Sequence, residues 1–419
     1  MDKIIVHGGR ALAGTVKISG SKNSALPILA ATLLTKEPCV IHRVPDLSDV
    51  HYMLQILNHL GAEVERASGV VTVKAEKVST VAPYEVVRKM RASVCVLGPL
   101  LGREKEATVS LPGGCVIGDR PIDLHLRGFE SLGAAVRVHA GDIKVFAPQL
   151  RGASISLKGK FGSTVLGTDN VMMAAVLADG VTVIQDAASE PEVVDLANFL
   201  NKMGAKIEGA GTSRIVIEGV PELHGAEHEV IPDRIEAGTF LIAGAIAGKE
   251  VTITRADQRH LTAVTNALES SGYKLSGDNG SLTIQPNGAL KPLDLRTEPY
   301  PGFPTDMQAQ MCALLATAEG DSAVTENIFP QRFMHISELK RMGAAIELDG
   351  ATAKISGVDG LSGAPVMASD LRASAALILA GLKAEGMTEI NRVYHIDRGY
   401  ELIDEKLGGL GAHIERVKV

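Results

Sequence analysis

The chain has 419 residues, of which 45% are hydrophobic and 22% charged, and its formal net charge is -7. A length beyond roughly 250–300 residues favours two domains, and a mildly acidic chain is not an electrostatic binder of nucleic acid or membrane overall. Aromatic residues make up only 3%, which favours an α/β or α+β fold over a base-stacking platform. The N-terminus has no signal-peptide pattern and no apolar run reaches the ~20 residues of a membrane span, so we expect a cytoplasmic protein.

Taken in chain order, one short pattern recurs six times: a helix-like segment, an apolar residue, a glycine and an alternating strand. Its glycines are Gly61, Gly133, Gly204, Gly272, Gly343 and Gly411. Each glycine suits the left-handed C-terminal cap of a helix, and the residues after it alternate as in a half-buried strand. The nearly constant spacing indicates an internal structural repeat.

Each repeat also contains a second segment that is apolar on nearly all sides, which predicts a buried helix. The six segments are residues 24–34, 92–102, 170–180, 237–248, 307–320 and 373–386. A unit of about 70 residues buries its core poorly alone, so we expect two groups of three units. The predicted domains are residues 22–229, and residues 1–21 together with 230–419, with the active site in the cleft between them.

Polar residues precede or open each predicted buried helix. They are Lys22-Asn23, Lys89-Met90-Arg91, Thr168-Asp169, Asp233-Arg234, Thr305-Asp306 and Asp370-Leu371-Arg372. Helix N-termini favour anions through their free amides and dipole. Cations there oppose the dipole, which suggests that they bind a ligand. The aspartates and threonines are equally well explained as ordinary N-caps.

The four cysteines are Cys39, Cys95, Cys115 and Cys312. They form no Cys-x-x-Cys pair, so neither a zinc site nor a disulfide framework is predicted. Three lie in or beside apolar runs and are predicted to be buried. Cys115 lies instead in a segment, residues 111–121, whose three glycines and two prolines exclude a regular element.

A thiol at the tip of such a loop is expected to be exposed, and the loop can close over a substrate. Arg120 is close enough in sequence to bind an anion or favour the thiolate. His125 follows soon after, so a Cys–His nucleophile pair is conceivable, as is a surface turn with an incidental cysteine. His335 and His395 are equally ambiguous, and no phosphate-binding-loop, dinucleotide or His-Glu-x-x-His motif is present.

Five motifs resemble, in the same order, those of UDP-N-acetylglucosamine 1-carboxyvinyltransferases. They are residues 20–27, 111–115, 120–125, 301–308 and 394–400. The resemblance implies a two-domain, inside-out α/β barrel of six βαβαββ units. It also implies transfer of the enolpyruvyl group of phosphoenolpyruvate to the 3′-hydroxyl of UDP-N-acetylglucosamine by addition and elimination, with release of phosphate. This is the first committed step of peptidoglycan synthesis, and it needs no metal, cofactor or obligate protein partner.

The resemblance further implies a role for each matching residue. Cys115 is expected to be the general acid, able to form a covalent adduct with phosphoenolpyruvate, and Asp306 the base for the sugar hydroxyl. The residues expected to bind phosphoenolpyruvate are Lys22, Asn23, Arg120, Arg372 and Arg398. The residues expected to bind UDP-N-acetylglucosamine are Asn23, Arg91, Arg120, Pro121, Ile122, Asp123, Leu124, Asp306 and Ile328.

One stretch departs from the resembled family. That family usually has a Ser-Val-Gly-Ala-Thr run that helps to hold the diphosphate, whereas residues 160–168 read Lys-Phe-Gly-Ser-Thr-Val-Leu-Gly-Thr, about two residues longer. Whether Lys158 or Lys160 reaches the phosphates is left open, as is the hydroxyl that replaces the serine.

Three other functions compete. Enolpyruvyl transfer to shikimate 3-phosphate, as in EPSP synthase, shares the fold, but that family lacks the loop cysteine and has a Gly-Asn-Ala-Gly-Thr helix start that is absent here. A non-catalytic nucleotide-sugar-binding regulator would need neither Cys115 nor Asp306. A thiol hydrolase using Cys115 and His125 would cleave esters or amides without phosphoenolpyruvate. An epoxide phosphonate such as fosfomycin is expected to alkylate Cys115 and none of the other three cysteines.

Overall fold

The computed structural model describes residues 2–111, 122–278 and 280–418. Two compact units can be distinguished within the chain. Of the described residues, 20–111 and 122–231 form the first, called here the contiguous unit. Residues 2–19, 232–278 and 280–418 form the second, called here the split unit because it combines the N-terminal strands with the second half of the chain. Each unit has its own hydrophobic core.

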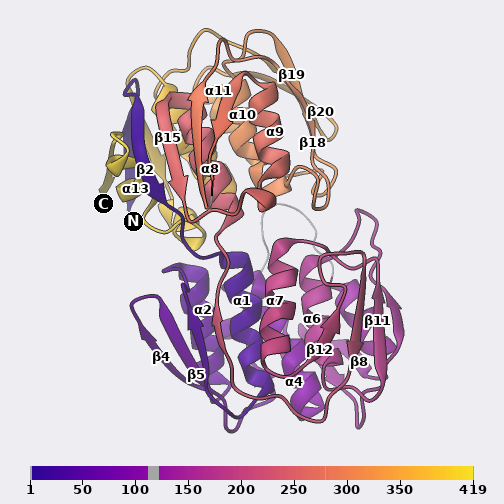
Figure 1. The fold of residues 1–419 in the computed structure, drawn as a ribbon. Coiled ribbons are helices and arrows are strands. Elements are labelled where there is room, and N and C mark those ends of the chain that lie inside the picture. Colours follow the sequence, from indigo (N-terminus) through magenta and orange to yellow (C-terminus); the bar gives the residue numbers. More distant parts are fainter. Residues whose placement is uncertain (1, 112–121, 279, 419) are drawn as a thin grey trace. The chain divides into compact units, whose positions relative to one another are not determined.

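The contiguous unit has three four-stranded sheets among its described residues (Figure 1). In each sheet one edge pair is parallel and the next two pairs are antiparallel. In spatial order the strands are β14 (Glu227–Glu229), β3 (Cys39–His42), β5 (Val70–Lys74) and β4 (Glu63–Ala67); β6 (Val81–Ala82), β7 (Glu106–Ser110), β9 (Asp142–Phe146) and β8 (Ala135–His139); and β10 (Ser154–Ser156), β11 (Val181–Gln185), β13 (Arg214–Glu218) and β12 (Lys206–Glu208).

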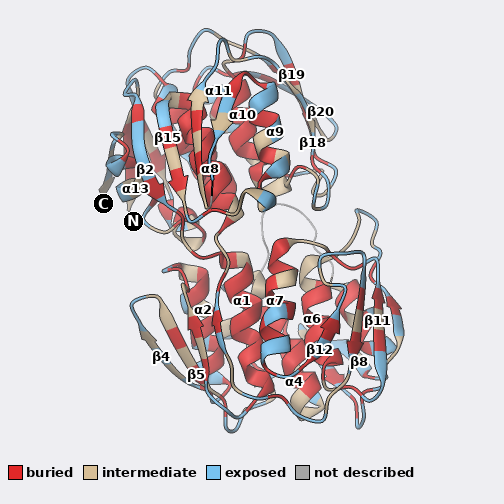
Figure 2. Cartoon of the chain, in the orientation of Figure 1, coloured by how far each residue is buried: buried red, intermediate tan, exposed pale blue. Residues whose placement is uncertain are grey.

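Its helices are of two kinds. The buried ones are α1 (Lys22–Ala31), α4 (Leu97–Glu104) and α6 (Val165–Ala175), extended by the 3-10 turns η1 (Thr32–Leu34) and η2 (Arg91–Val96). The more amphipathic ones are α2 (Ser48–His59), α5 (Asp123–Ser131) and α7 (Pro191–Lys202), with a short α3 (Tyr84–Val87). Figure 2 shows α1 and α6 buried along most of their length, as expected for helices that are apolar on nearly all sides.

The split unit repeats the same sheet pattern three times. In spatial order its strands are β2 (Leu12–Lys17), β15 (Gly248–Thr254), β17 (Ser281–Pro286) and β16 (Tyr273–Ser276); β18 (Asp294–Arg296), β19 (Asp321–Thr325), β21 (Thr352–Ser356) and β20 (Ala345–Asp349); and β22 (Pro365–Met367), β23 (Met387–Asn391), β1 (Lys3–His7) and β24 (His413–Val417). The first two strands of the chain therefore belong to sheets completed by its C-terminal half.

The helices of the split unit follow the same two kinds. The buried ones are α8 (Arg234–Ala247), α10 (Gln308–Leu315) and α12 (Leu371–Lys383), and α10 packs against both of the others. The more exposed ones are α9 (Thr262–Ser270), α11 (Met334–Arg341) and α13 (Ile403–Gly409), and the 3-10 turns are η3 (Gln258–His260), η4 (Thr305–Met307) and η5 (Val393–Arg398). None of the helices described is long and apolar enough to span a bilayer.

The repeat glycines behave as the sequence predicts. All six have left-handed backbones, with φ between +93° and +103°, directly after a helix. This conformation costs glycine little because it has no Cβ. The predicted left-handed caps are therefore confirmed in both units.

The third buried helix starts earlier than predicted. Helix α6 begins at Val165, five residues before the predicted start, and Thr164 caps it by accepting the backbone N–H of Gly167. Thr168 and Asp169 therefore lie inside the helix. A Cβ at Gly167 would stand 2.3 Å from Cγ2 of Thr164, so the tight cap itself requires glycine.

Candidate active site

A buried cluster of charged residues in the split unit surrounds Asp306. Its Oδ1 accepts a hydrogen bond from Nη1 of Arg332 at 2.7 Å, and its Oδ2 accepts one from Nη2 of Arg372 at 3.2 Å. The side chains of the two arginines are 8% and 1% exposed, whereas that of Asp306 is 25% exposed. Buried guanidinium groups are costly unless they are paired. Here both are paired with the same carboxylate, which they hold in a fixed position while it remains partly exposed to solvent.

Three segments bring these side chains together. Asp306 lies in η4, which leads into the buried helix α10. Arg372 lies in the first turn of α12, whose N-cap Asp370 accepts the backbone N–H groups of Arg372 and the next residue. Arg332 lies in the turn before α11. Asp370 is therefore a cap, whereas Asp306 uses its side chain for the arginines.

A network of neutral groups supports the cluster. Nε2 of Gln310 lies 2.9 Å from the backbone oxygen of Asp306 and 3.2 Å from each of the hydroxyls of Thr239 and Tyr400. The guanidinium carbon of Arg372 lies 5.1 Å from the centre of the Tyr400 ring. Burial opposes the charge on Arg372, but Tyr400 and Asp306 more than offset it, so its pKa is raised. Arg372 therefore stays charged inside the fold.

Arg398 is partly exposed at the end of η5. The preceding residue, Asp397, accepts two hydrogen bonds from Arg416, with N···O distances of 3.0 and 2.7 Å. A bidentate pair fixes geometry as well as charge. It therefore holds the end of η5, and with it the backbone of Arg398, in place.

Two histidines of the split unit lie near these arginines. Burial lowers the pKa of His335 to about 4, although Asp370 opposes the shift. Burial also lowers the pKa of the half-buried His395, and the charge of Arg398 adds to the effect. Both rings are therefore neutral near pH 7.

In the contiguous unit, Lys22 is the first residue of α1 and is 8% exposed. Its Nζ lies 3.4 Å from Oδ2 of Asp49, in the first turn of α2. Ser21 caps the helix, and Asn23 follows Lys22 in a partly buried position. The two predicted substrate-binding residues therefore lie within the first turn of α1 and not before it.

The residues expected to bind the nucleotide sugar lie at two other helix starts of this unit. Arg91 opens η2 and is partly buried. Ile122 is the N-cap residue of α5, followed by an exposed Asp123 and a buried Leu124. Ile328, also expected to contact the sugar, is partly buried in a turn of the split unit.

His125 of α5 is buried and does not face solvent. Its Nδ1 lies 2.9 Å from Nδ2 of Asn170, which also donates to the carbonyl of Val94 at 3.1 Å. Burial, aided by the charge of Arg91, lowers the pKa of His125 to about 3. The ring is therefore a neutral part of the core, which argues against its alternative role as the base of a Cys–His pair.

The stretch that departs from the resembled family forms a tight turn before α6. The backbone N–H of Gly159 donates to the carbonyl of Gly162 at 2.8 Å. Lys158 and Lys160 are exposed, and the ammonium of Lys160 lies 5.1 Å from the centre of the Phe161 ring. Two cationic side chains thus come shortly before a helix N-terminus.

Three predicted site residues lie outside the described part of the chain: Cys115, Arg120 and Pro121. Their roles stay predictions. The other three cysteines are buried free thiols, as predicted. Burial raises the pKa of Cys39 to about 11 and also raises those of Cys95 and Cys312. A raised pKa makes these thiols poor nucleophiles.

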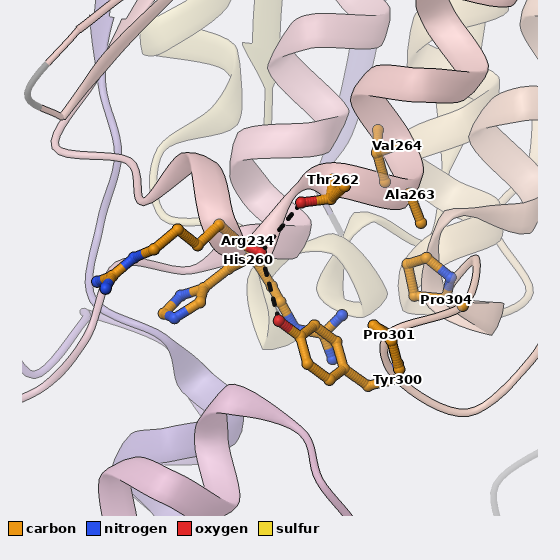
Figure 3. A pocket seen from close by; sticks show the side chains of 10 residues that line it. Arg234, His260, Thr262, Ala263, Val264, Tyr300, Pro301 and Pro304 are labelled. Atoms are coloured by element: carbon orange, nitrogen blue, oxygen red, sulfur yellow. Dashed lines mark hydrogen bonds between the residues drawn. The ribbon is translucent and has the colours of Figure 1, made fainter. Parts of the chain in front are cut away.

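A small hollow in the split unit is lined by Arg234, His260 and Tyr300 (Figure 3). The hydroxyls of Tyr300 and Thr262 both donate to the backbone carbonyl of Arg259, at 3.3 Å each. The hollow's volume of about 10 Å³ is enough for one water molecule. It is therefore too small for a nucleotide sugar, and none of the described residues assigned to phosphoenolpyruvate or UDP-N-acetylglucosamine lines it.

Comparison with known proteins identifies the family. The family model of EPSP synthase (3-phosphoshikimate 1-carboxyvinyltransferase) matches residues 6–407. A UDP-N-acetylglucosamine 1-carboxyvinyltransferase from Akkermansia muciniphila is 61% identical, over 100% of this chain and 99% of the relative. One of the same name from Methylacidiphilum infernorum is 60% identical, also over 100% and 99%. This chain belongs to the UDP-N-acetylglucosamine 1-carboxyvinyltransferase family.

Solved structures agree with the fold of the carboxyvinyltransferases. The enolpyruvyl transferase NikO from Streptomyces tendae matches with a TM-score of 0.90 and 26% identity, over 100% of this chain and 99% of that one. An EPSP synthase from Acinetobacter baumannii matches over the full length of both chains with a TM-score of 0.79, and at 17% identity this shows the fold alone. The predicted enolpyruvyl-transferase fold is therefore confirmed.

Sequence reasoning missed several residues of the charged cluster that surrounds Asp306 in this carboxyvinyltransferase. Arg332 lies in an irregular turn, and no local pattern marks it. Gln310 does carry a signal, because it and Gln308 are fully buried polar residues in a helix whose other residues are apolar. A buried amide needs hydrogen-bond partners, so its position predicts a polar network at that end of α10.

Proposed function

We propose that this chain transfers the enolpyruvyl group of phosphoenolpyruvate to the 3′-hydroxyl of UDP-N-acetylglucosamine. The observation that carries the proposal is the carboxylate of Asp306, partly open to solvent and bound by two buried arginines, in a chain of this family. Addition of an alcohol to an enol phosphate needs a base near the attacking hydroxyl and cations near the anionic substrate. The split unit supplies both kinds of group.

The reaction proceeds by addition and then elimination. The sugar oxygen forms a bond to C2 of phosphoenolpyruvate and loses its proton to Asp306, while C3 receives a proton from the Cys115 thiol. In the resulting tetrahedral ketal, the bond from C2 to the phosphate oxygen then breaks. C3 returns a proton as the C2=C3 double bond re-forms, and inorganic phosphate leaves. A thiol with an ordinary pKa of about 8.5 is largely protonated at neutral pH, as a general acid must be.

Phosphoenolpyruvate carries a phosphate and a carboxylate on three carbons, so several cations must hold it. Lys22, Arg120, Arg372 and Arg398 are assigned to it, with Asn23 beside them. Guanidinium groups suit both anions because they donate two parallel hydrogen bonds. The assignment draws on both units of the chain, so it requires residues of each to meet at the substrate.

The nucleotide sugar is assigned to Arg91, Arg120, residues 121–124, Asp306 and Ile328, and shares Asn23 with phosphoenolpyruvate. Leu124, an apolar residue in the first turn of α5 that is 9% exposed, is assigned to contact the uracil. Lys158 and Lys160 are the cations available to the diphosphate in the stretch before α6, where free N-terminal amides can also bind phosphate oxygens.

In the cell this activity would begin peptidoglycan synthesis in the cytoplasm, and cell-wall growth, shape and division would depend on it. Fosfomycin would inhibit it by alkylating Cys115. Intact-protein mass followed by peptide mapping tests this point. One adduct on Cys115 supports the assignment, and an adduct on Cys39, Cys95 or Cys312 contradicts it.

Phosphate release with each acceptor tests the function itself. The purified chain is incubated with phosphoenolpyruvate and either UDP-N-acetylglucosamine or shikimate 3-phosphate. Release with the nucleotide sugar alone is the expected result. Release only with shikimate 3-phosphate would establish the EPSP synthase reaction, and binding of the nucleotide sugar without any turnover would indicate a regulator.

A further inference from the structure

Glu326 is a buried carboxylate at the end of β19 in the split unit. Its Oε1 accepts hydrogen bonds from the hydroxyl of Thr297 at 2.6 Å and from the backbone N–H groups of Ile328 and Phe329 at 2.8 and 2.9 Å. Its Oε2 accepts one from the hydroxyl of Thr305 at 2.8 Å. The residue is 0% exposed. A buried charge needs such partners, and these four donors come from three separate segments.

The first arm of this network leads to Asp306. The hydroxyl of Thr305 donates its one proton to Glu326, so its lone pairs are left to accept from Nη1 of Arg332 at 3.1 Å. The same Nη1 donates to Oδ1 of Asp306 at 2.7 Å. Each group in the series has only one possible direction of donation. Glu326 therefore sets the orientation of Thr305, which sets that of Arg332, which holds Asp306.

The second arm holds the turn that contains Ile328. Glu326 accepts the two backbone N–H groups of this turn directly. Thr297, while donating to Glu326, accepts the N–H of Asn327 at 2.9 Å. All three amides at the start of the turn are thus satisfied by two buried side chains, which fixes its backbone.

We propose that Glu326 is a positioning residue of the acceptor site, which aligns Asp306 through Thr305 and Arg332 and fixes the backbone around Ile328. The proposal rests on the proposed function, in which Asp306 is the base for the sugar hydroxyl. Base and hydroxyl must meet in a near-attack geometry, and a displacement of about 1 Å can lower the rate about 100-fold. A loosened Asp306 is therefore expected to lower kcat and to leave the binding of phosphoenolpyruvate nearly unchanged.

The hydroxyl of Thr305 gives the sharpest test, because it can be removed at nearly constant volume. Thr305→Val is expected to lower kcat about 10-fold or more, with KM for phosphoenolpyruvate within about twofold of the wild type. Thr305→Ser keeps the hydroxyl and is expected to recover kcat to within about threefold. Thr252→Val is the matched control, since Thr252 lies in β15 and its hydroxyl contacts that of Thr283 at 2.8 Å, away from the cluster.

Glu326→Gln gives an independent test. The amide oxygen can still accept from Thr297 and from the two backbone N–H groups, but the amide nitrogen cannot accept the proton of Thr305. This variant is expected to show a loss of kcat similar to that of Thr305→Val. The double variant is expected to be no slower than the worse of the two single variants, because both break the same series.

Thermal unfolding of each variant distinguishes positioning from mere stability. A Thr305→Val protein that unfolds at a lower temperature but keeps the wild-type kcat per folded molecule overturns the proposal. Equal losses in the Val and Ser variants also overturn it, because the hydroxyl would then be irrelevant. A wild-type chain that turns over only shikimate 3-phosphate overturns the proposed acceptor and this assignment with it, whereas wild-type activity with an unaffected Thr305→Val overturns this inference alone.

Discussion

The two units share one plan but carry different chemistry at the starts of their buried helices. The helix starts of the split unit carry three aspartates: Asp233, Asp306 and Asp370. Those of the contiguous unit carry Lys22, Arg91 and a threonine cap at Thr164. The repeat therefore determines where a polar side chain is placed, and the individual residue determines its charge.

The difference has an energetic side. An aspartate at a helix N-terminus is favoured by the free amides and the dipole, whereas a cation there is not. Asp233 and Asp370 thus stabilise the fold on their own account. Lys22 and Arg91 do not stabilise their helices in this way, and Lys22 instead forms a buried ion pair with Asp49 at 3.4 Å.

At another position the repeat preserves the same residue, a buried histidine. His125 and His335 occupy the same place in the second and fifth units, each eight residues before the glycine that ends its helix, Gly133 or Gly343. Both rings are buried, with pKa values lowered to about 3 and about 4. The contiguous and split units therefore differ in the charges at their helix starts but share a buried, neutral histidine at the equivalent core position.

The largest expected effect on the rate comes from changing Asp306, the proposed base in the split unit. Asp306→Asn keeps the shape of the side chain but removes the base, so kcat is expected to fall about 10²- to 10⁴-fold. Steady-state phosphate release measures this. The control is Asp349→Asn, an exposed aspartate of β20 that pairs with Lys354. An Asp306→Asn enzyme with wild-type kcat would remove the distinction between the helix starts.

The next effect concerns the cation of the contiguous unit. Lys22→Gln is expected to lower kcat/KM for phosphoenolpyruvate about 100-fold, because one of the groups that bind its charge is lost. Lys22→Arg keeps the charge and is expected to lose less. The exposed Lys36 of the same unit provides the control, as Lys36→Gln. If Lys22→Gln leaves kcat/KM unchanged, this cation has no part in binding substrate.

The buried histidines test what the units share. Between pH 6.5 and the lowered pKa, the unfolded chain binds a proton that the folded one does not, so stability falls as the pH falls. Each histidine is expected to lower the free energy of unfolding by about 2 kcal/mol when the pH falls from 7 to 5. Urea unfolding at both pH values measures this. His125→Asn and His335→Asn should each flatten the dependence, and an unchanged slope in either variant would contradict the burial of that ring as a neutral group.

The smallest effect on substrate binding is expected from changing Arg416, which holds Asp397 next to Arg398. Arg416→Lys replaces the bidentate contact with Asp397 by a single one. The end of η5 then loosens, and KM for phosphoenolpyruvate is expected to rise about two- to fivefold. Arg341→Lys, at an exposed arginine of α11, is the control. An unaltered KM would show that Arg398 does not depend on this support.

Much of the fold could be predicted because it repeats. Six left-handed glycines and six apolar helices leave a periodic signal in the sequence, and the structure places each glycine after a helix. The third buried helix was predicted to start at residue 170, five residues after its start at Val165. The cap formed by Thr164 depends on a close contact with Gly167 that no local pattern reveals.

The candidate site was predicted only in part. Asp306 and Lys22 were assigned because each lies near a helix start within a motif that resembles the family, and Arg372 was assigned from the resemblance and a helix start alone. Arg332 and Glu326 were missed because their roles depend on contacts between segments far apart along the chain, such as the 2.8 Å hydrogen bond from Thr305 to Glu326. Contacts of this kind are created by folding and leave no spacing in the sequence.

The split unit also bears on how the chain is made. Strands β1 and β2 are synthesised before the contiguous unit, yet β1 pairs with β23 and β24 and β2 pairs with β15, all of which follow that unit along the chain. The three sheets of the contiguous unit can close in the meantime without either strand. Strand β1 therefore waits, with unpaired edges, until β23 and β24 have been made, and β2 waits until β15 has been made. A change in or next to β1 and β2 would therefore destabilise sheets whose other strands lie in the C-terminal half, far along the chain from the change itself.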